Sequence, residues 1–108
     1  MSGAATGERF HVKVEAVAWA TTFVGGDGNE RKAFEVEASP GDTVRSVLKR
    51  LSARFPALDE ALWDRGSGEL GEHIEVAVND ALLGIRHTLA SPVQPGDEIL
   101  LMGQFMGG

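Results

Sequence analysis

The last two residues of the chain, Gly107 and Gly108, have the types and position best suited to chemistry. Glycine has no Cβ, so nothing obstructs the terminal carboxylate and the backbone leading to it bends freely. Such an end can enter a narrow enzyme active site and present a bare carboxylate there. Glycine loses more conformational freedom than any other residue when it is ordered. It is therefore a poor choice for a terminus whose role is only to pack against the domain. The pattern therefore makes the accessible Gly108 carboxylate a candidate reaction site, for which the rest of the chain must supply the context.

Composition excludes several classes of function. A chain of 108 residues is one domain of common size, and it can bury a core without disulfides or metals. It contains no cysteine, which excludes disulfides, a thiolate nucleophile and cysteine-ligated metals, and any sulfur chemistry has no side-chain thiol to use. The net charge of −6 matches phosphate backbones poorly, so we expect no nucleic-acid partner. Steering toward a basic protein partner is favoured instead.

Other candidate sites are weaker. Gly25, Gly26 and Gly28 lack the spacing of a phosphate-binding loop and indicate a turn. The three histidines have no metal-ligand spacing, so we expect surface or edge positions and no metal site; they are His11, His73 and His87. No Ser–His–Asp constellation can be identified, since sequence does not show spatial proximity.

Nothing in the chain predicts a membrane span or a secretory signal. The longest apolar runs are short and belong to strands. Residues 1–8 are small and polar and are expected to form a disordered tail rather than a signal peptide. We therefore expect a cytoplasmic protein that does not bind membranes.

The apolar spacing predicts strands around one main helix. Residues 9–19 alternate as a half-buried strand, and a turn-rich connection over 21–30 leads to a second strand at 34–38. Thr43 is the expected N-cap of a helix that ends before Pro56. Its apolar stripe comprises Val44, Val47, Leu48 and Leu51, while Arg45, Lys49, Arg50 and Arg54 face water. A helical turn near Leu58 and Leu62, strands at 74–78 and 98–102 and a short strand at 82–85 follow.

This order predicts an α+β fold of the β-grasp type. The first and last strands pair in parallel at the centre of a mixed sheet of four to five strands, with one main helix packed on one face. We expect the domain to span residues 9–103 and a flexible tail to span 104–108.

Three stretches, at 40–44, 74–80 and 95–99, precede the terminal diglycine in an order and spacing that carry a family likeness. The chain resembles the ubiquitin-like sulfur carriers. These are the small subunit of molybdopterin synthase, the thiamine-biosynthesis sulfur carrier and their relatives in cysteine synthesis. The resemblance covers roughly residues 9–108 and implies a ubiquitin-like β-grasp fold.

The resemblance also implies a mechanism and partners. An E1-like enzyme uses ATP to adenylate the Gly108 carboxylate, and sulfur then replaces AMP to give a thiocarboxylate. That group donates sulfur to a biosynthetic enzyme, either the large subunit of molybdopterin synthase, the first expectation, or a cysteine-synthase-like enzyme. The carrier is then no enzyme itself, binds no cofactor and is a monomer when free.

The residues before the diglycine depart from the family pattern. The family usually has small residues or proline there, whereas this chain has Gln104, Phe105 and Met106. The two large apolar side chains either anchor the tail in a partner's groove or pack back on the domain. With Gly107, these residues are the expected partner contacts.

An apolar open face of the sheet is the second expected docking surface. Val17, Trp19 and some of Leu100, Leu101 and Met102 are candidates, and the last strand is apolar throughout, so its facing is not fixed. Trp19 and Trp63 favour the core over ligand platforms. An acidic stretch is either solvated surface or a contact for a basic partner; it comprises Asp59, Glu60, Asp64, Glu69 and Glu72.

Two alternatives stay open. A ubiquitin-like modifier shares the adenylation step and differs only in being joined through Gly108 to lysines, and nothing in the sequence separates it from a carrier. A β-grasp interaction module with an incidental tail would need no chemistry at Gly108.

Overall fold

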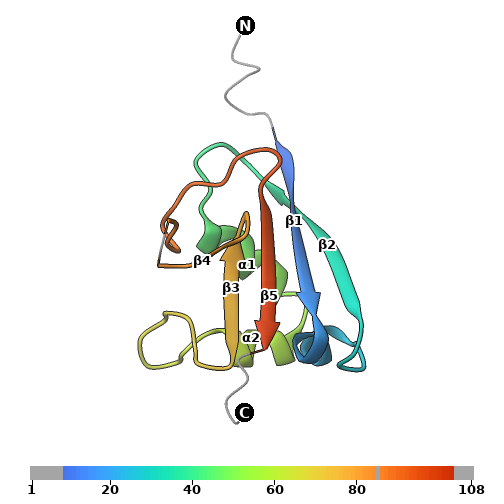
Figure 1. The fold of residues 1–108 in the computed structure, drawn as a ribbon. Coiled ribbons are helices and arrows are strands. Elements are labelled where there is room, and N and C mark those ends of the chain that lie inside the picture. The colour runs from blue at the N-terminus through green and yellow to red at the C-terminus, as the bar shows by residue number, and fades with distance from the viewer. Residues whose placement is uncertain (1–8, 85, 104–108) are drawn as a thin grey trace, which may run out of the picture.

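The computed structural model describes residues 9–84 and 86–103. They form a five-stranded sheet with two α-helices on one face and a 3₁₀ helix at one end (Figure 1). The elements are β1 (Phe10–Val17), η2 (Ala18–Val24), β2 (Arg31–Ala38), α1 (Val44–Ser52), α2 (Pro56–Leu62), β3 (Ile74–Val78), β4 (Ala81–Leu82) and β5 (Glu98–Gly103). The expected tails at 1–8 and 104–108 lie outside the described residues.

The strand order β2-β1-β5-β3-β4 confirms the predicted β-grasp arrangement. β1 and β5 are parallel neighbours at the centre, with Val14 opposite Ile99. β2 pairs antiparallel with β1, and β3 pairs antiparallel with β5. β5 therefore has a paired neighbour on both sides from Ile99 to Met102, and β3 still pairs with it at Gly103.

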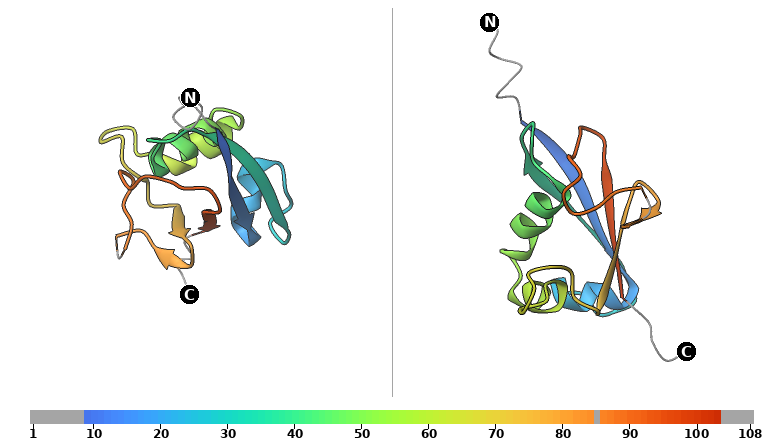
Figure 2. Two further views of the ribbon diagram at one scale, coloured as in Figure 1. Left: turned by 90° about the horizontal axis from the view of Figure 1, so that it is seen from above. Right: turned by 90° about the vertical axis from the view of Figure 1, so that its left-hand side faces the viewer.

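The core lies between the sheet and the helices, which cover only one face (Figure 2). β1 alternates as predicted, so that Val12, Val14 and Ala16 are at most 1% exposed while His11 and Lys13 face solvent. The whole predicted stripe of α1, Val44, Val47, Leu48 and Leu51, is buried to the same degree. The apolar periodicity of the sequence therefore located both surfaces of this core.

α1 begins and ends through specific polar contacts. The Thr43 hydroxyl accepts from the backbone N–H of Ser46, and the Ser46 side chain caps Thr43 in return, which confirms the predicted N-cap. Pro56 is the first residue of α2, where its missing N–H costs no hydrogen bond. No described helix has the length and apolar character that crossing a bilayer requires.

A partly buried chain of hydrogen bonds joins the two helices. The Trp63 indole Nε1 donates to Ser52 Oγ (3.1 Å), and that hydroxyl donates to Asp59 Oδ1 (2.9 Å). Trp63 is 6% exposed, which confirms its prediction as a core residue. The Lys49 ammonium lies 4.2 Å from the centre of the indole ring and covers it from the solvent side.

The turn before α1 is tied to the helix by an ion pair, which gives a first prediction. Asp42 Oδ2 accepts from Arg50 Nη1 (2.6 Å) and from the Ser39 backbone N–H (2.8 Å), and these bonds hold the pKa of Asp42 below its usual value. We expect Asp42→Asn to lower the free energy of unfolding at pH 7 by about 1 kcal/mol, since Arg50 is half exposed and solvent screens the pair.

The same variant tests the pH dependence of this contact. A carboxylate whose pKa is lowered by folding stabilises the fold above its unfolded pKa, and the contribution is lost as the pH falls through the folded value. The stability difference between the parent chain and Asp42→Asn should therefore be constant near neutrality and shrink below about pH 4. Denaturant titrations at pH 7 and pH 3 measure it, and an equal difference at both would contradict the assignment.

Three predicted boundaries were wrong, and one of them is the start of the second strand, which begins at Arg31 instead of residue 34. The first strand ends at Val17 instead of continuing to residue 19, because Ala18 takes a left-handed conformation (φ 52°) and η2 begins there. Ala18 is consequently exposed, although the alternation had placed it inside. The short strand predicted at 82–85 is the two-residue β4, Ala81–Leu82, and Ile85 lies outside the described residues.

Candidate functional site

The predicted site residues begin one position beyond the described structure. Gln104, Phe105, Met106, Gly107 and Gly108 all lie outside the described residues. The structure instead fixes where they start. β5 ends at Gly103, at the end of the sheet where η2 and α2 also lie (Figure 1). The candidate site is therefore this end of the domain together with the sheet face that no helix covers.

Gly103 is held against an aromatic side chain. A Cβ placed on Gly103 would overlap Trp19 Cε3, closer than van der Waals contact allows, and would lie 3.2 Å from Trp19 Cβ. The indole and the strand backbone thus approach so closely at Gly103 that a side chain there would require the indole to move. This contact places Trp19 beside the last residue before the predicted tail.

The Gly103–Trp19 contact predicts a stability change whose sign depends on Trp19. Gly103→Ala should cost about 1 kcal/mol, at the low end for overpacking, because the part-exposed indole can shift away. In a Trp19→Ala background the same change should become neutral or stabilising by roughly 0.5–1 kcal/mol, since alanine suits a strand better than glycine. A double-mutant cycle of unfolding free energies measures this, and equal costs in both backgrounds would refute the contact.

Trp19 is an exposed aromatic, contrary to its prediction as a core residue. It is 44% exposed, and its ring packs edge-on against Phe23 at 5.0 Å between centroids. The strand alternation itself pointed away from the core, since it placed Trp19 with Val17 on the open face, where Trp19 was also expected as a docking candidate. The structure places Trp19 beyond the end of β1, in η2, with its indole against Gly103.

Thr21 fixes η2 and therefore the position of Trp19. It is fully buried, and its hydroxyl donates to the Ala18 carbonyl (2.7 Å) and accepts from the Gly28 backbone N–H (3.0 Å). The Thr22 hydroxyl likewise donates to the Trp19 carbonyl (2.8 Å). These bonds satisfy backbone groups of a short helix that has no side-chain N-cap.

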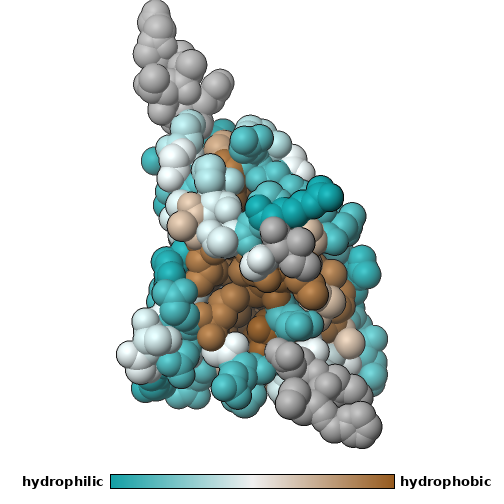
Figure 3. Space-filling model, turned by 60° about the vertical axis from the view of Figure 1, so that its left-hand side comes forward, coloured by the Kyte–Doolittle hydropathy of each residue, from teal (hydrophilic) through white to brown (hydrophobic). Residues whose placement is uncertain are grey.

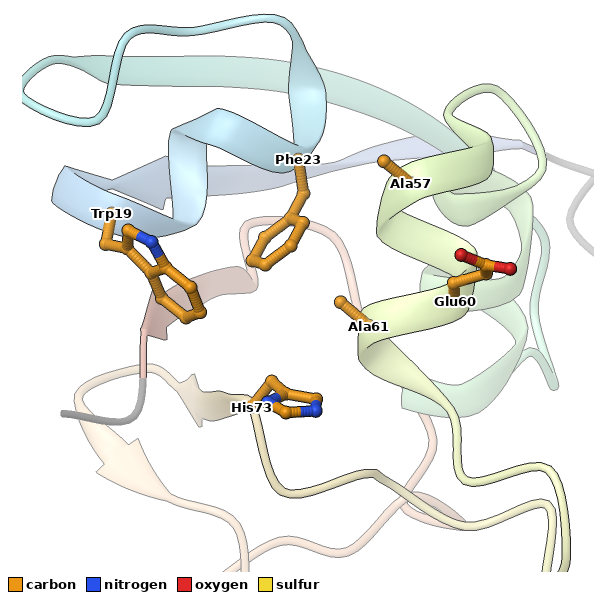
Figure 4. A pocket seen from close by; sticks show the side chains of 6 residues that line it. All are labelled: Trp19, Phe23, Ala57, Glu60, Ala61 and His73. Atoms are coloured by element: carbon orange, nitrogen blue, oxygen red, sulfur yellow. The ribbon is translucent and has the colours of Figure 1, made fainter. Parts of the chain in front are cut away.

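A hollow of about 390 Å³ opens beside Trp19 (Figure 4). Its lining residues are Trp19 and Phe23 from η2, Ala57, Glu60 and Ala61 from α2, and His73 just before β3. The two aromatic rings lie across from the small side chains of α2, as Figure 4 shows. The sequence analysis did not identify Phe23, Ala57 or Ala61, because they come from two elements far apart in the chain.

The uncovered sheet face is apolar around β5, and the structure settles the facing of that strand. Ile99 and Leu101 are at most 1% exposed and face the helices, so Leu101 is removed from the candidates. Leu100 and Met102 alternate to the other face, where Met102 pairs with Val17. Leu82 of β4, which pairs with β3, is 40% exposed on this same uncovered face of the sheet. Figure 3 shows apolar surface gathered over this part of the molecule.

Most of the acidic stretch engages this chain's own groups. Glu60 pairs with Arg65 (2.9 Å), and Glu69 pairs with Arg45 (3.0 Å). The Asp64 carboxylate accepts from the hydroxyl and backbone N–H of Ser67, which lowers the pKa of Asp64. These carboxylates organise the surface loop before β3, in agreement with the solvated-surface interpretation.

The histidines lie apart from one another. His11 and His73 are exposed, and His87 is half-buried in the loop after β4. Across residues 9–84 and 86–103, no group of three histidine or acidic side chains is placed to hold a metal ion.

Comparison with known proteins supplies the family. The model of the ThiS family matches residues 20–108, well over half of the chain. The sulfur carrier protein CysO of Mycobacterium tuberculosis is 29% identical over 72 residues, which cover 66% of this chain and 77% of CysO.

Solved structures share the fold. The small archaeal modifier protein 1 of Methanosarcina acetivorans superposes with a TM-score of 0.71 at 22% identity, covering 94% of this chain and 100% of that one. A chain of the BexX/CysO complex of Amycolatopsis orientalis superposes with a TM-score of 0.68 at 24% identity, covering 90% and 99%. With the match over residues 20–108, these likenesses establish that this chain is a ubiquitin-like β-grasp protein belonging to the ThiS family.

Proposed function

We propose that this protein is a sulfur carrier whose working group is the Gly108 carboxylate. The observation that carries the proposal is the position of β5 in a ThiS-family chain. This central strand is held on both sides and ends at Gly103, and residues 104–108, which include the Gly107–Gly108 pair, follow it in a sequence that the family model matches through residue 108. The domain thus serves as a rigid handle for a short tail with an unobstructed end.

The proposed chemistry runs in two steps on the terminal carboxyl group. In the first, a carboxylate oxygen attacks the α-phosphorus of ATP, so that pyrophosphate leaves and an acyl-adenylate forms. In the second, a hydrosulfide equivalent attacks the acyl carbon and AMP leaves with the former carboxylate oxygen. The product is a thiocarboxylate in which one oxygen has been replaced by sulfur. Adenylation is needed because a free carboxylate is a poor electrophile.

In this proposal the chain supplies the acyl group and its partners supply everything else. ATP is bound by an E1-like adenylating enzyme, and this domain holds no cofactor of its own. The sulfur acceptor is the large subunit of a molybdopterin synthase or, next, a cysteine-synthase-like enzyme. Leu100 and Met102 on the uncovered face, Trp19 and the tail residues 104–107 would form the contacts with these partners. The free carrier is proposed to be a cytoplasmic monomer.

A ubiquitin-like modifier is the second candidate. It is favoured by the fold shared with a protein named as a small archaeal modifier, although that likeness at 22% identity extends to the fold alone. Both candidates pass through the same acyl-adenylate, so only the acceptor distinguishes them. In the modifier, a lysine amine would displace AMP or a later leaving group and form an isopeptide bond to Gly108.

Mass spectrometry of the protein from its native host distinguishes the two. The carrier predicts an oxygen-to-sulfur exchange located in the C-terminal peptide that ends at Gly108. The modifier predicts Gly-Gly remnants on the lysines of other proteins. If cells grown under sulfur demand show neither the exchange at Gly108 nor Gly-Gly remnants on other proteins, both candidates are contradicted.

A further inference from the structure

We infer that the hollow between η2 and α2 binds the side chain of Phe105, the chain's own aromatic residue two positions beyond β5. The hollow is lined by Trp19, Phe23, Ala57, Ala61, Glu60 and His73. This assignment goes beyond the proposed function, because it concerns how the tail leaves the domain before any partner acts on it.

Strand alternation places Phe105 on the correct side. Side chains of successive strand residues point to opposite faces, so residues 99, 101, 103 and 105 share one side. Ile99 and Leu101 point to the core, and the Cβ position of Gly103 points to Trp19. A continued extended chain therefore directs Phe105 toward the same side, and directs Met106 with Met102 toward the uncovered face.

The reach of the chain also fits. Two residues of extended backbone span about 7 Å, so Phe105 lies one short step beyond the Gly103–Trp19 contact. β3 runs antiparallel to β5 with Ile74 opposite Gly103, so the chain before Ile74 would lie beside residues 104 and 105 if β5 continued in the same direction. His73, which lines the hollow, is the first residue of that accompanying segment.

The chemistry of the hollow suits an aromatic ring. Trp19 and Phe23 already form an edge-on pair, and a third ring can pack against them with a similar geometry. Ala57 and Ala61 form a wall of small side chains opposite these rings (Figure 4). Trp19 is 44% exposed, so covering it removes apolar surface from water. Met106, Gly107 and Gly108 would then extend beyond the docked ring.

Nuclear magnetic resonance of the full-length free protein tests this inference directly. We expect cross-relaxation between the Phe105 ring protons and the methyl groups of Ala57 and Ala61, which lie on the far wall of the hollow. Phe105→Ala should shift the Trp19 indole N–H signal. Trp63 is the internal reference, because its buried indole N–H is bonded to Ser52 and should not move.

Matched variants separate docking from simple proximity. Met106→Ala removes a large apolar side chain one residue away but on the opposite side, and it should leave the Trp19 signal in place. Ala57→Leu, at an exposed position on the wall, should fill the hollow and abolish the cross-relaxation from Phe105 to Ala61. Ala53→Leu, an equal enlargement at the C-cap of α1, should preserve it.

The alternatives give different results. If no contact from Phe105 to α2 is seen and Phe105→Ala leaves Trp19 unchanged, the hollow is open for a partner and the inference is wrong. If the hollow's signals instead depend on protein concentration and not on Phe105, a second copy of the chain occupies it, and the inference is equally wrong. No activating enzyme takes part in this experiment, so its outcome is independent of the proposed sulfur chemistry.

Discussion

Removal of Gly107 and Gly108 should abolish adenylation and leave the stability of the domain unchanged. The carboxylate of the truncated chain would end on Met106, where a large side chain replaces the bare approach to the activating site. Among the described residues the buried core runs from Val12 to Leu101, and this deletion leaves Phe105 and Met106 in place. We expect ATP–pyrophosphate exchange by the E1-like partner to fall to background with no change in Tm.

The control for this prediction is a deletion at the other terminus. Removing residues 1–8 shortens the chain by more residues but keeps the diglycine, so exchange should persist. If the chain without Gly107 and Gly108 supports exchange as well as the full chain does, the tail is incidental. The protein would then be a β-grasp interaction module instead.

The largest stability effect is expected at the centre of β5. Leu101→Ala should lower the free energy of unfolding by about 2–5 kcal/mol, because Leu101 is fully buried between the sheet and the helices. Leu100→Ala makes the same chemical change one residue away, on the uncovered face. There we expect a cost below about 1 kcal/mol, since the lost side chain is already partly in contact with water.

Chemical denaturation of both variants measures this difference, and the pair also separates stability from partner binding. Leu100→Ala should weaken binding to the activating or sulfur-accepting enzyme while the domain stays folded. Equal stability losses for the two variants would mean that the facing of β5 is assigned wrongly.

The fold was predictable where one periodicity dominated. Alternation over 10–17 identified β1, the helical stripe from Val44 to Leu51 identified α1, and Thr43 marked its start. Their order then required β5 to return in parallel beside β1. These features depend on local patterns, and a single sequence displays them directly.

The end of β1 was not predictable in this way. Ala18 adopts a left-handed conformation that alanine rarely takes, so its residue type gave no sign that the strand stops there. The exposure of Trp19 follows from that turn. The hollow beside it combines η2 with α2, and such a meeting of distant elements leaves no spacing in the sequence.

The facing of β5 was also hidden from the sequence. Apolar and polar residues normally alternate along a strand that has one covered and one solvent-exposed face. In β5, however, Leu100 and Met102 are as apolar as Ile99 and Leu101. The alternation is missing because the uncovered face itself carries apolar side chains. In a ThiS-family chain this is the face that we propose for docking, so the feature that obscured the prediction is the one that supports a functional surface.

The role of Gly108 was reached through resemblance rather than through the fold. The residues themselves indicated only an accessible carboxylate, and the three motif stretches tied it to carriers. The described structure adds the anchor at Gly103 and its aromatic neighbour Trp19. It therefore supports a defined starting point for the tail, while the chemistry at the carboxylate stays a proposal.

Intact-mass spectrometry of the full chain after incubation with its E1-like enzyme, ATP and hydrosulfide is the most direct measurement of the central proposal. A carrier should show one oxygen replaced by sulfur, localised by fragmentation to Gly108 and absent when ATP is omitted. The chain lacking Gly107 and Gly108 should show no exchange. An unchanged mass of the full chain, under conditions in which the same enzyme releases pyrophosphate, would contradict the sulfur-carrier account.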